Sequence, residues 1–220
     1  MCRQTTSVSS VRVGRDLPAV LTSMFSVPRS PLVAPEPLSD GVVVLRLRDE
    51  RDVPSIASAS SDPETRQWLD DEPLTSERQR DLVSRAEDQW RTGRGAPFVI
   101  ADGASDRALG LLNVQFDDDE EVAALAVSVF PEARGRGVAS RALRLAAKWA
   151  TLDLGLQRVY AEAASDNIAS IRAIEKAGFR REGLLRAHCK THGRRHDCVM
   201  FSVVPSDFAA AAADEPGPPG

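Results

Sequence analysis

A buried strand that leads directly into a long helix restricts the possible folds of this 220-residue chain more than any other feature. Val122–Phe130 is an uninterrupted apolar run, which indicates a buried strand. From about Gly137 to Leu154, apolar residues recur on one helical face and basic residues lie off it. The connecting loop reads Arg-Gly-Arg-Gly at 134–137. We therefore expect a strand, a glycine-containing loop and a helix in direct succession.

The segments around this unit alternate between strand and helix patterns. Strands are expected at 42–47, 98–101, 108–116, 157–163, 178–188 and 198–204, and helices at 52–59, 62–68, 75–92 and 167–177. This order predicts an α/β fold (α+β, with a mixed sheet) that has helices on the faces of the sheet. Parallel neighbours are expected wherever strand, helix and strand alternate.

The uneven distribution of proline gives the domain boundaries. Of the 14 prolines, five lie before residue 41 and four lie after residue 204. Proline clusters are typical of linkers, because proline removes a backbone donor and fixes φ. We predict a domain at 36–208 between disordered tails at 1–35 and 209–220. Met24 is an alternative start, which leaves open whether residues 1–23 belong to the protein.

Composition excludes several functional classes. With 28 Lys and Arg against 32 Asp and Glu, the net charge is −4, which argues against sequence-independent nucleic-acid binding. No apolar run approaches the roughly 20 residues of a membrane span, and the N-terminus lacks a signal-peptide pattern. Three cysteines are too few for a disulfide framework and fit a reducing cytosol. A cytoplasmic protein without nucleic-acid or membrane partners is expected.

The Arg-Gly-Arg-Gly loop has the properties of an anion site. The unpaired N–H groups at a helix start attract phosphate, and glycines let the backbone approach it closely. The alternative is a glycine-containing helix entry with solvated arginines. The chain has no Gly-Lys pair, so a Walker A loop is excluded. A dinucleotide fingerprint is also excluded, because Ser140 stands where its third glycine or alanine is required.

Two motifs in order resemble a known family. Arg134-Gly135-Arg136-Gly137-Val138-Ala139 is similar to the R/Q-x-x-G-x-G/A signature of the GNAT superfamily of acyl-CoA N-acyltransferases. A second block, with Asn167 and Ser170 followed by Lys176-Ala177-Gly178-Phe179, resembles the RimJ/RimL-type N-terminal acetyltransferases. The resemblance covers about residues 40–206. It implies the GNAT fold, a mixed and mostly antiparallel sheet with splayed central strands and flanking helices.

The resemblance also implies a site for acetyl-CoA as co-substrate, without a metal. The loop amides would hold its pyrophosphate, and a bulged, splayed strand end would bind the pantetheine arm and polarise the thioester carbonyl. Ser170 would donate a proton to the departing thiolate, or it simply packs on the helix face. Asn167 would touch the pantetheine arm, and it also fits a helix N-cap. The residues expected to contact acetyl-CoA are Val127, Ser128, Val129, Arg134, Gly135, Arg136, Gly137, Val138, Ala139, Asn167 and Ser170.

Several positions depart from the family pattern and leave the general base unassigned. The only tyrosine, Tyr160, precedes Asn167 instead of following the last helix, and Ala123-Ala124 replaces a glutamate often found on the cofactor-binding strand. Cys189 occupies the position of a carboxylate in RimL-like enzymes. The candidate bases or amine-attracting groups are Glu162, His188 and the acidic run 117–121, each of which is alternatively a surface charge. Arg136, Arg141 and Arg144 either reach the 3′-phosphate of CoA or form a solvated helix face.

A cluster of histidines and cysteines near the C-terminus suggests a metal site at first sight, namely His188, Cys189, His192, His196 and Cys198. Strand alternation would place His188 and Cys189 on opposite faces, so we predict no metal there.

The expected reaction is direct attack of a neutral amine on acetyl-CoA in a ternary complex. An α-amine with a pKa of about 7.7 is roughly one-sixth neutral at pH 7, whereas a lysine amine near 10.4 is less than about 0.1% neutral. Without a strong base, this favours a protein or peptide N-terminus as acceptor. The alternatives are a small amine, such as an antibiotic, polyamine or amino acid, and an inactive CoA-binding sensor. A monomer or homodimer is expected.

Overall fold

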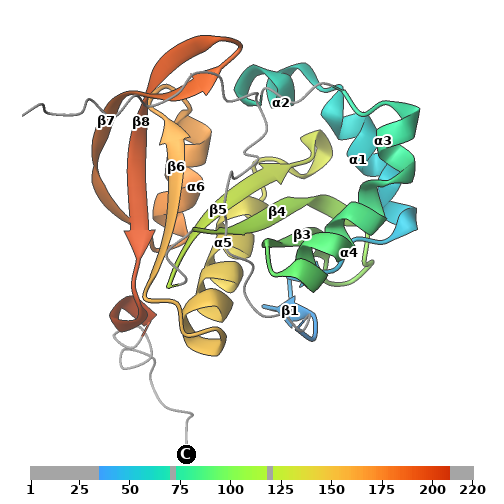
Figure 1. Cartoon of the computed structure of the whole chain (residues 1–220), viewed down its shortest axis with the longest axis horizontal. Coiled ribbons are helices and arrows are strands. Elements are labelled where there is room, and N and C mark those ends of the chain that lie inside the picture. The colour runs from blue at the N-terminus through green and yellow to red at the C-terminus, as the bar shows by residue number, and fades with distance from the viewer. Residues whose placement is uncertain (1–34, 70–72, 118–120, 209–220) are drawn as a thin grey trace, which may run out of the picture.

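An eight-stranded mixed sheet forms the centre of the protein, as a computed structural model that describes residues 35–69, 73–117 and 121–208 shows (Figure 1). The strands are β1 (Leu38–Ser39), β2 (Val43–Arg46), β3 (Gly95–Asp102), β4 (Ala108–Phe116), β5 (Val122–Val129), β6 (Arg158–Ala164), β7 (Arg180–Thr191) and β8 (Arg194–Val203). Their order in the sheet is β1-β2-β3-β4-β5-β6-β8-β7. Only β5 and β6 pair in parallel among these strands. Apart from Pro35, the predicted tails lie outside the described residues.

Six α-helices connect the strands in the described part of the chain. They are α1 (Val53–Ser60), α2 (Pro63–Trp68), α3 (Ser76–Arg80), α4 (Leu82–Thr92), α5 (Val138–Lys148) and α6 (Ile168–Lys176). None of the helices in these described segments is long and apolar enough to span a membrane.

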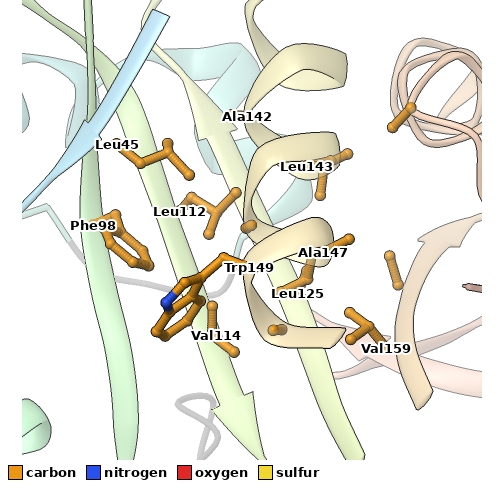
Figure 2. Packing of buried hydrophobic residues seen from close by; sticks show 14 of the residues in the cluster. Leu45, Phe98, Leu112, Val114, Leu125, Ala142, Leu143, Ala147, Trp149 and Val159 are labelled. Atoms are coloured by element: carbon orange, nitrogen blue, oxygen red, sulfur yellow. The ribbon is translucent and has the colours of Figure 1, made fainter. Parts of the chain in front are cut away.

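The main core lies between one face of the sheet and helices α5 and α6. Alternate residues of the strands point to this face, because successive side chains of a strand point to opposite sides. Figure 2 shows Leu45, Leu112 and Leu125 from three strands meeting Leu143 and Trp149, which follow one another along α5 and the helical turn after it. Alanines 142, 146 and 147 are fully buried, so α5 lies close against the sheet.

A smaller cluster covers the opposite face at the β2–β4 end. Ile56 of α1 and Leu82 of α4 pack there on Val99 and Ala101 of β3. No helix of the described residues covers the same face of β5, β6 and β8, as Figure 1 shows.

The structure corrects several predicted element boundaries. The helix expected at 75–92 breaks at Asp81 into α3 and α4. The helix expected to run to Leu154 leaves the α conformation after Lys148 and ends in a π-helical turn, where the Thr151 hydroxyl donates to the Ala147 carbonyl. The last two strands are longer than expected.

The parallel neighbours were predicted correctly for one of two units. β5, α5 and β6 give the parallel pair. β6 and β7 are separated by β8, which pairs antiparallel with both of them.

An ion pair and a hydrogen bond connect strands β6, β7 and β8. Arg158 of β6 donates two hydrogen bonds to Glu182 of β7, at 2.6 and 2.5 Å. Ser202 of the intervening β8 donates to the same carboxylate at 2.7 Å. Arg158, and then Ser202, lower the pKa of Glu182 to about 2.

This lowered pKa predicts an acid-dependent part of the stability. An unfolded glutamate has a pKa of about 4.3, so the contribution is complete above that pH and is lost as pH falls toward 2. Both side chains are about one-third exposed or more, so we expect no more than about 1 kcal/mol. Urea unfolding of wild type and Glu182→Gln should differ more at pH 6 than at pH 3. Glu87→Gln, at an exposed position of α4, is the control, and an equal difference at both pH values would contradict the assignment.

Candidate active site

The central strands β5 and β6 are joined at one end only. Their pairing consists of Val122 with Arg158, Ala123 with Val159 and Ala124 with Tyr160. Beyond these pairs the strands diverge, and Figure 1 shows them separating toward the end of the sheet near α2. Ala126 is exposed in the middle of β5, and residues 127–129 are half-buried. The predicted splay is therefore confirmed, and it leaves backbone groups of β5 without a partner strand in the described part of the sheet.

The prediction of a bulge on β5 is wrong. β5 pairs with β4 from Gly110↔Val129 to Phe116↔Ala123 without a register shift. An irregularity instead interrupts β7 between Leu185 and Cys189, where Ala187 has a φ of +49°. The Asp197 carboxylate accepts the Ala187 N–H, and Arg195 donates to the Ala187 carbonyl.

The loop before α5 adopts a conformation that needs its glycines. Gly135 and Gly137 have φ values of +72° and +77°, in the left-handed region that favours glycine. The backbone N–H groups of residues 135–137 donate no hydrogen bond within the described segments. A Cβ built on Gly137 would lie 3.9 Å from the Lys176 ammonium, so a cation stands beside the loop. The unpaired amides, the helix start and the lysine together suit an anionic group such as a pyrophosphate.

The arginines of this region do not all face the loop opening. Arg134 turns its guanidinium to α2, where it donates to Asp62 at 2.6 Å, Thr65 at 2.8 Å and Glu64 at 2.9 Å. This contact lowers the pKa of Asp62. Arg141 is paired with Asp40 at 2.7 Å. Of the three arginines considered for a 3′-phosphate, only Arg136 and Arg144 donate no hydrogen bond to another described residue.

Asn167 caps α6 as the sequence predicted. Its side chain accepts the Ser170 N–H at 3.1 Å. Ser170 is half-buried in the first turn of α6, the helix that follows β6, and its hydroxyl makes no hydrogen bond to a described residue. Its role as an acid and the contact of Asn167 with a cofactor stay predictions.

A carboxylate stands on the far edge of the split. Glu162 lies on β6 two residues beyond Tyr160, which pairs with Ala124, so its side chain points to the sheet face that also carries Ala126. His188 Nε2 lies 3.2 Å from Glu162, and the sulfur of Cys189 lies 3.7 Å from it. The prediction that His188 and Cys189 point to opposite faces is wrong, because the irregular stretch of β7 disrupts the alternation. Glu162 thus places a carboxylate beside position 189, and its role as a base stays a prediction.

The cysteines also differ from expectation. Cys189 and Cys198 form a disulfide between β7 and β8, with a Cα–Cα distance of 5.9 Å. The sequence suggested free thiols because three cysteines make no framework. The two cysteines are nine positions apart, on the two strands of one hairpin. The register shift between Leu185 and Cys189 accompanies their approach, and nothing in the sequence indicated this shift.

Tyr160 and Asp117, the first residue of the acidic run, lie beside each other. The Tyr160 hydroxyl lies 3.2 Å from Asp117, and burial and the Asp117 charge raise the pKa of Tyr160 to about 12. Of the acidic run 117–121, residues 118–120 lie outside the described residues.

Arg48 is a charged residue of this face that sequence reasoning did not single out. Its Nη2 donates to Asn113 on β4 at 2.7 Å, and its Nε is enclosed without a hydrogen-bond partner among the described residues. Burial lowers the pKa of Arg48 to about 10. In the sequence, only the alternation Leu45-Arg46-Leu47-Arg48 indicates that the two arginines point to the same side.

The comparisons with known proteins agree with this geometry. A family model described as an acetyltransferase (GNAT) domain matches residues 43–180. The uncharacterized N-acetyltransferase p20 of Bacillus licheniformis is 28% identical over 169 residues, which cover 76% of this chain and 95% of that protein. Among solved structures, Mycobacterium smegmatis RimJ in complex with CoA-disulfide is 22% identical, with a TM-score of 0.67 over 80% of this chain and 93% of its own.

A second similar structure is that of an enzyme whose name gives a polyamine as acceptor. A chimera of Vibrio cholerae spermidine N-acetyltransferase SpeG and hSSAT is 21% identical, with a TM-score of 0.64 over 76% of this chain and 98% of its own. At these identities the structural matches show the fold alone, and they confirm the predicted GNAT fold. The family model covers more than half of the chain, and the chain therefore belongs to the GNAT family of N-acetyltransferases.

Proposed function

We propose that this protein transfers the acetyl group of acetyl-CoA to the α-amine of a protein or peptide N-terminus. The observation that carries the proposal is the split between β5 and β6 beside the glycine loop of α5. A split gives a thioester free backbone donors, and the loop gives its diphosphate a cluster of amides and a helix start.

The chain's own residues divide the work as follows. The loop at 134–139 binds the pyrophosphate through backbone amides, with Lys176 beside it. The free edge of β5 binds the pantetheine arm, and Asn167 holds the first turn of α6 so that Ser170 stands at the sulfur. In this arrangement Arg134 positions the loop and the amides that follow it bind the anion, because the Arg134 N–H donates to the Pro131 carbonyl and its side chain is bound to Asp62.

The reaction joins the amine nitrogen to the thioester carbonyl carbon and breaks the carbon–sulfur bond. A backbone N–H of β5 stabilises the oxyanion of the tetrahedral species. Glu162, paired with His188, accepts the proton that the amine loses, directly or through water. Ser170 donates a proton to the departing thiolate and regains one from solvent.

The α-amine is favoured because roughly one-sixth of it is already neutral at pH 7, against less than about 0.1% of a lysine amine. The chain also shares its fold, with a TM-score of 0.69 at 18% identity, with the Vibrio fischeri ribosomal-protein-S5-alanine acetyltransferase, whose name gives a protein acceptor. A small polyamine is the second candidate, supported by the similarity to a spermidine N-acetyltransferase.

Gly137→Val should abolish or strongly weaken acetyl-CoA binding, by at least about tenfold in Kd, because a β-branched residue at this positive φ distorts the loop. Calorimetry with acetyl-CoA measures the effect. Gly155→Val is the matched control, since Gly155 has a φ of +73° and lies away from the loop with no atom within 4 Å of its Cβ position. Unchanged binding by Gly137→Val would refute the loop assignment.

Thiol release from acetyl-CoA should appear with peptides that carry a free Ala, Ser, Thr or Met N-terminus and disappear when the α-amine is blocked. The parallel panel contains polyamines, aminoglycosides and free amino acids. Turnover confined to that panel would move the acceptor to a small amine. Silence on both panels, with acetyl-CoA bound, would replace the transferase proposal by a binding role.

Ser170→Ala should lower kcat by at least about tenfold while the Kd for acetyl-CoA stays within twofold, because a general acid acts on the leaving group and not on binding. Steady-state kinetics and calorimetry separate the two effects. Ser165→Ala, at an exposed position before Asn167, is the control. Turnover at the wild-type rate would assign Ser170 to packing.

A further inference from the structure

Arg48 reaches across the sheet face that carries the split. It follows β2 and donates to Asn113 of β4, two strands away in the sheet. Asn113 is paired directly with Ala126 of β5, and paired residues of antiparallel strands point to the same face. Because Ala126 is exposed, the Arg48 head group lies one strand from the open part of β5.

Among the described residues, no carboxylate forms a hydrogen bond or ion pair with Arg48. A guanidinium carries five N–H donors, and Arg48 uses one of them, toward the neutral amide of Asn113, within the part of the chain that the structure describes. Asp52 is the carboxylate that acts on it electrostatically. Both Asp52 oxygens are already bound by Arg46, at 2.8 and 2.9 Å.

The neighbouring arginines show that this is unusual for the chain. Arg46, Arg134 and Arg158 each donate to a carboxylate at 2.9 Å or less. Among these four arginines, only Arg48 lacks, within the described segments, a carboxylate that accepts its hydrogen bonds. Burial lowers the pKa of Arg48, and no such carboxylate offsets this effect. A bound anion would supply the missing compensation, and a guanidinium matches a carboxylate with two parallel hydrogen bonds.

We propose that Arg48, together with Asn113, binds a carboxylate of the amine acceptor, so that the enzyme selects acceptors carrying an anionic group near the amine. The proposal rests on the proposed acetyl transfer at the split. Adjacent strands lie about 4.8 Å apart, so the Arg48 guanidinium lies roughly 5–10 Å from an amine held over Ala126, and a carboxylate near that amine can bridge the gap. An acidic side chain at the start of a peptide and the α-carboxylate of a free amino acid both satisfy this geometry.

Matched acceptor pairs test the proposal on the full-length protein. Peptides beginning with Glu or Asp are compared with twins beginning with Gln or Asn, and alanine is compared with alaninamide. In at least one of the two kinds of pair, wild type should show a kcat/KM at least about tenfold higher for the member with the carboxylate. The kind of pair that shows this preference identifies the acceptor as a peptide or a free amino acid. In Arg48→Met the ratio should fall to about one, while Arg48→Lys should keep part of it. Ratios near one in wild type, or a ratio that persists in Arg48→Met, would overturn the proposal.

A binding measurement keeps this proposal separate from the transferase proposal. The same pairs are titrated calorimetrically into the CoA complex of wild type, Arg48→Met and Arg48→Gln, which retains a donor for Asn113. If no amine is acetylated but wild type prefers carboxylates and both variants lose the preference, the transferase proposal fails and the carboxylate site stands. Equal affinities of wild type and variants, or no binding by wild type, reject the site. Arg91→Met, with a side chain 73% exposed on α4, is the control for net charge.

Discussion

Hydrogen bonds between β5 and β6 exist for three residue pairs and then stop, and the rest of the site depends on this interruption. The core on the other face of the two strands stays continuous, because α5 and α6 pack against them. The sheet therefore opens on one side only. Backbone donors of β5 that a continuous sheet would consume are left without a partner strand in the described part of the sheet, next to the face that carries Glu162 and Arg48.

Local signals predicted the parts of this arrangement that depend on local geometry. Gly135 and Gly137 have the positive φ values expected of a tight helix entry, and Asn167 caps α6. The break at Asp81 was missed, because no glycine or proline interrupts residues 75–92. The left-handed Ala187 is held by Asp197 and Arg195 from the next strand, and such nonlocal contacts leave no periodic trace in the sequence. The burial of Arg48 is likewise a tertiary property.

Four arginines of similar sequence character have four different physical roles. Arg46 binds Asp52 and Asp106 and fixes the start of α1. Arg134 joins the glycine loop to α2, and Arg158 holds three strands through Glu182. Arg48 is enclosed with a single neutral acceptor. A guanidinium that stabilises the fold is distinguished from one that is available for binding by its partners, which only the structure reveals.

No residue of α2 is buried, so this short helix is held by polar contacts. Arg134 binds its first turn, and the ring of His192, from the β7–β8 turn, lies 2.7 Å from the Arg66 carbonyl near its end. Charge interactions of exposed groups are screened by salt with a Debye length of about 8 Å at physiological ionic strength, whereas apolar packing is not weakened in this way. The Arg134–Glu64 pair, whose carboxylate side chain is 60% exposed, is therefore the part of the α2 attachment most open to screening by salt, whereas the Arg134–Asp62 pair is more enclosed.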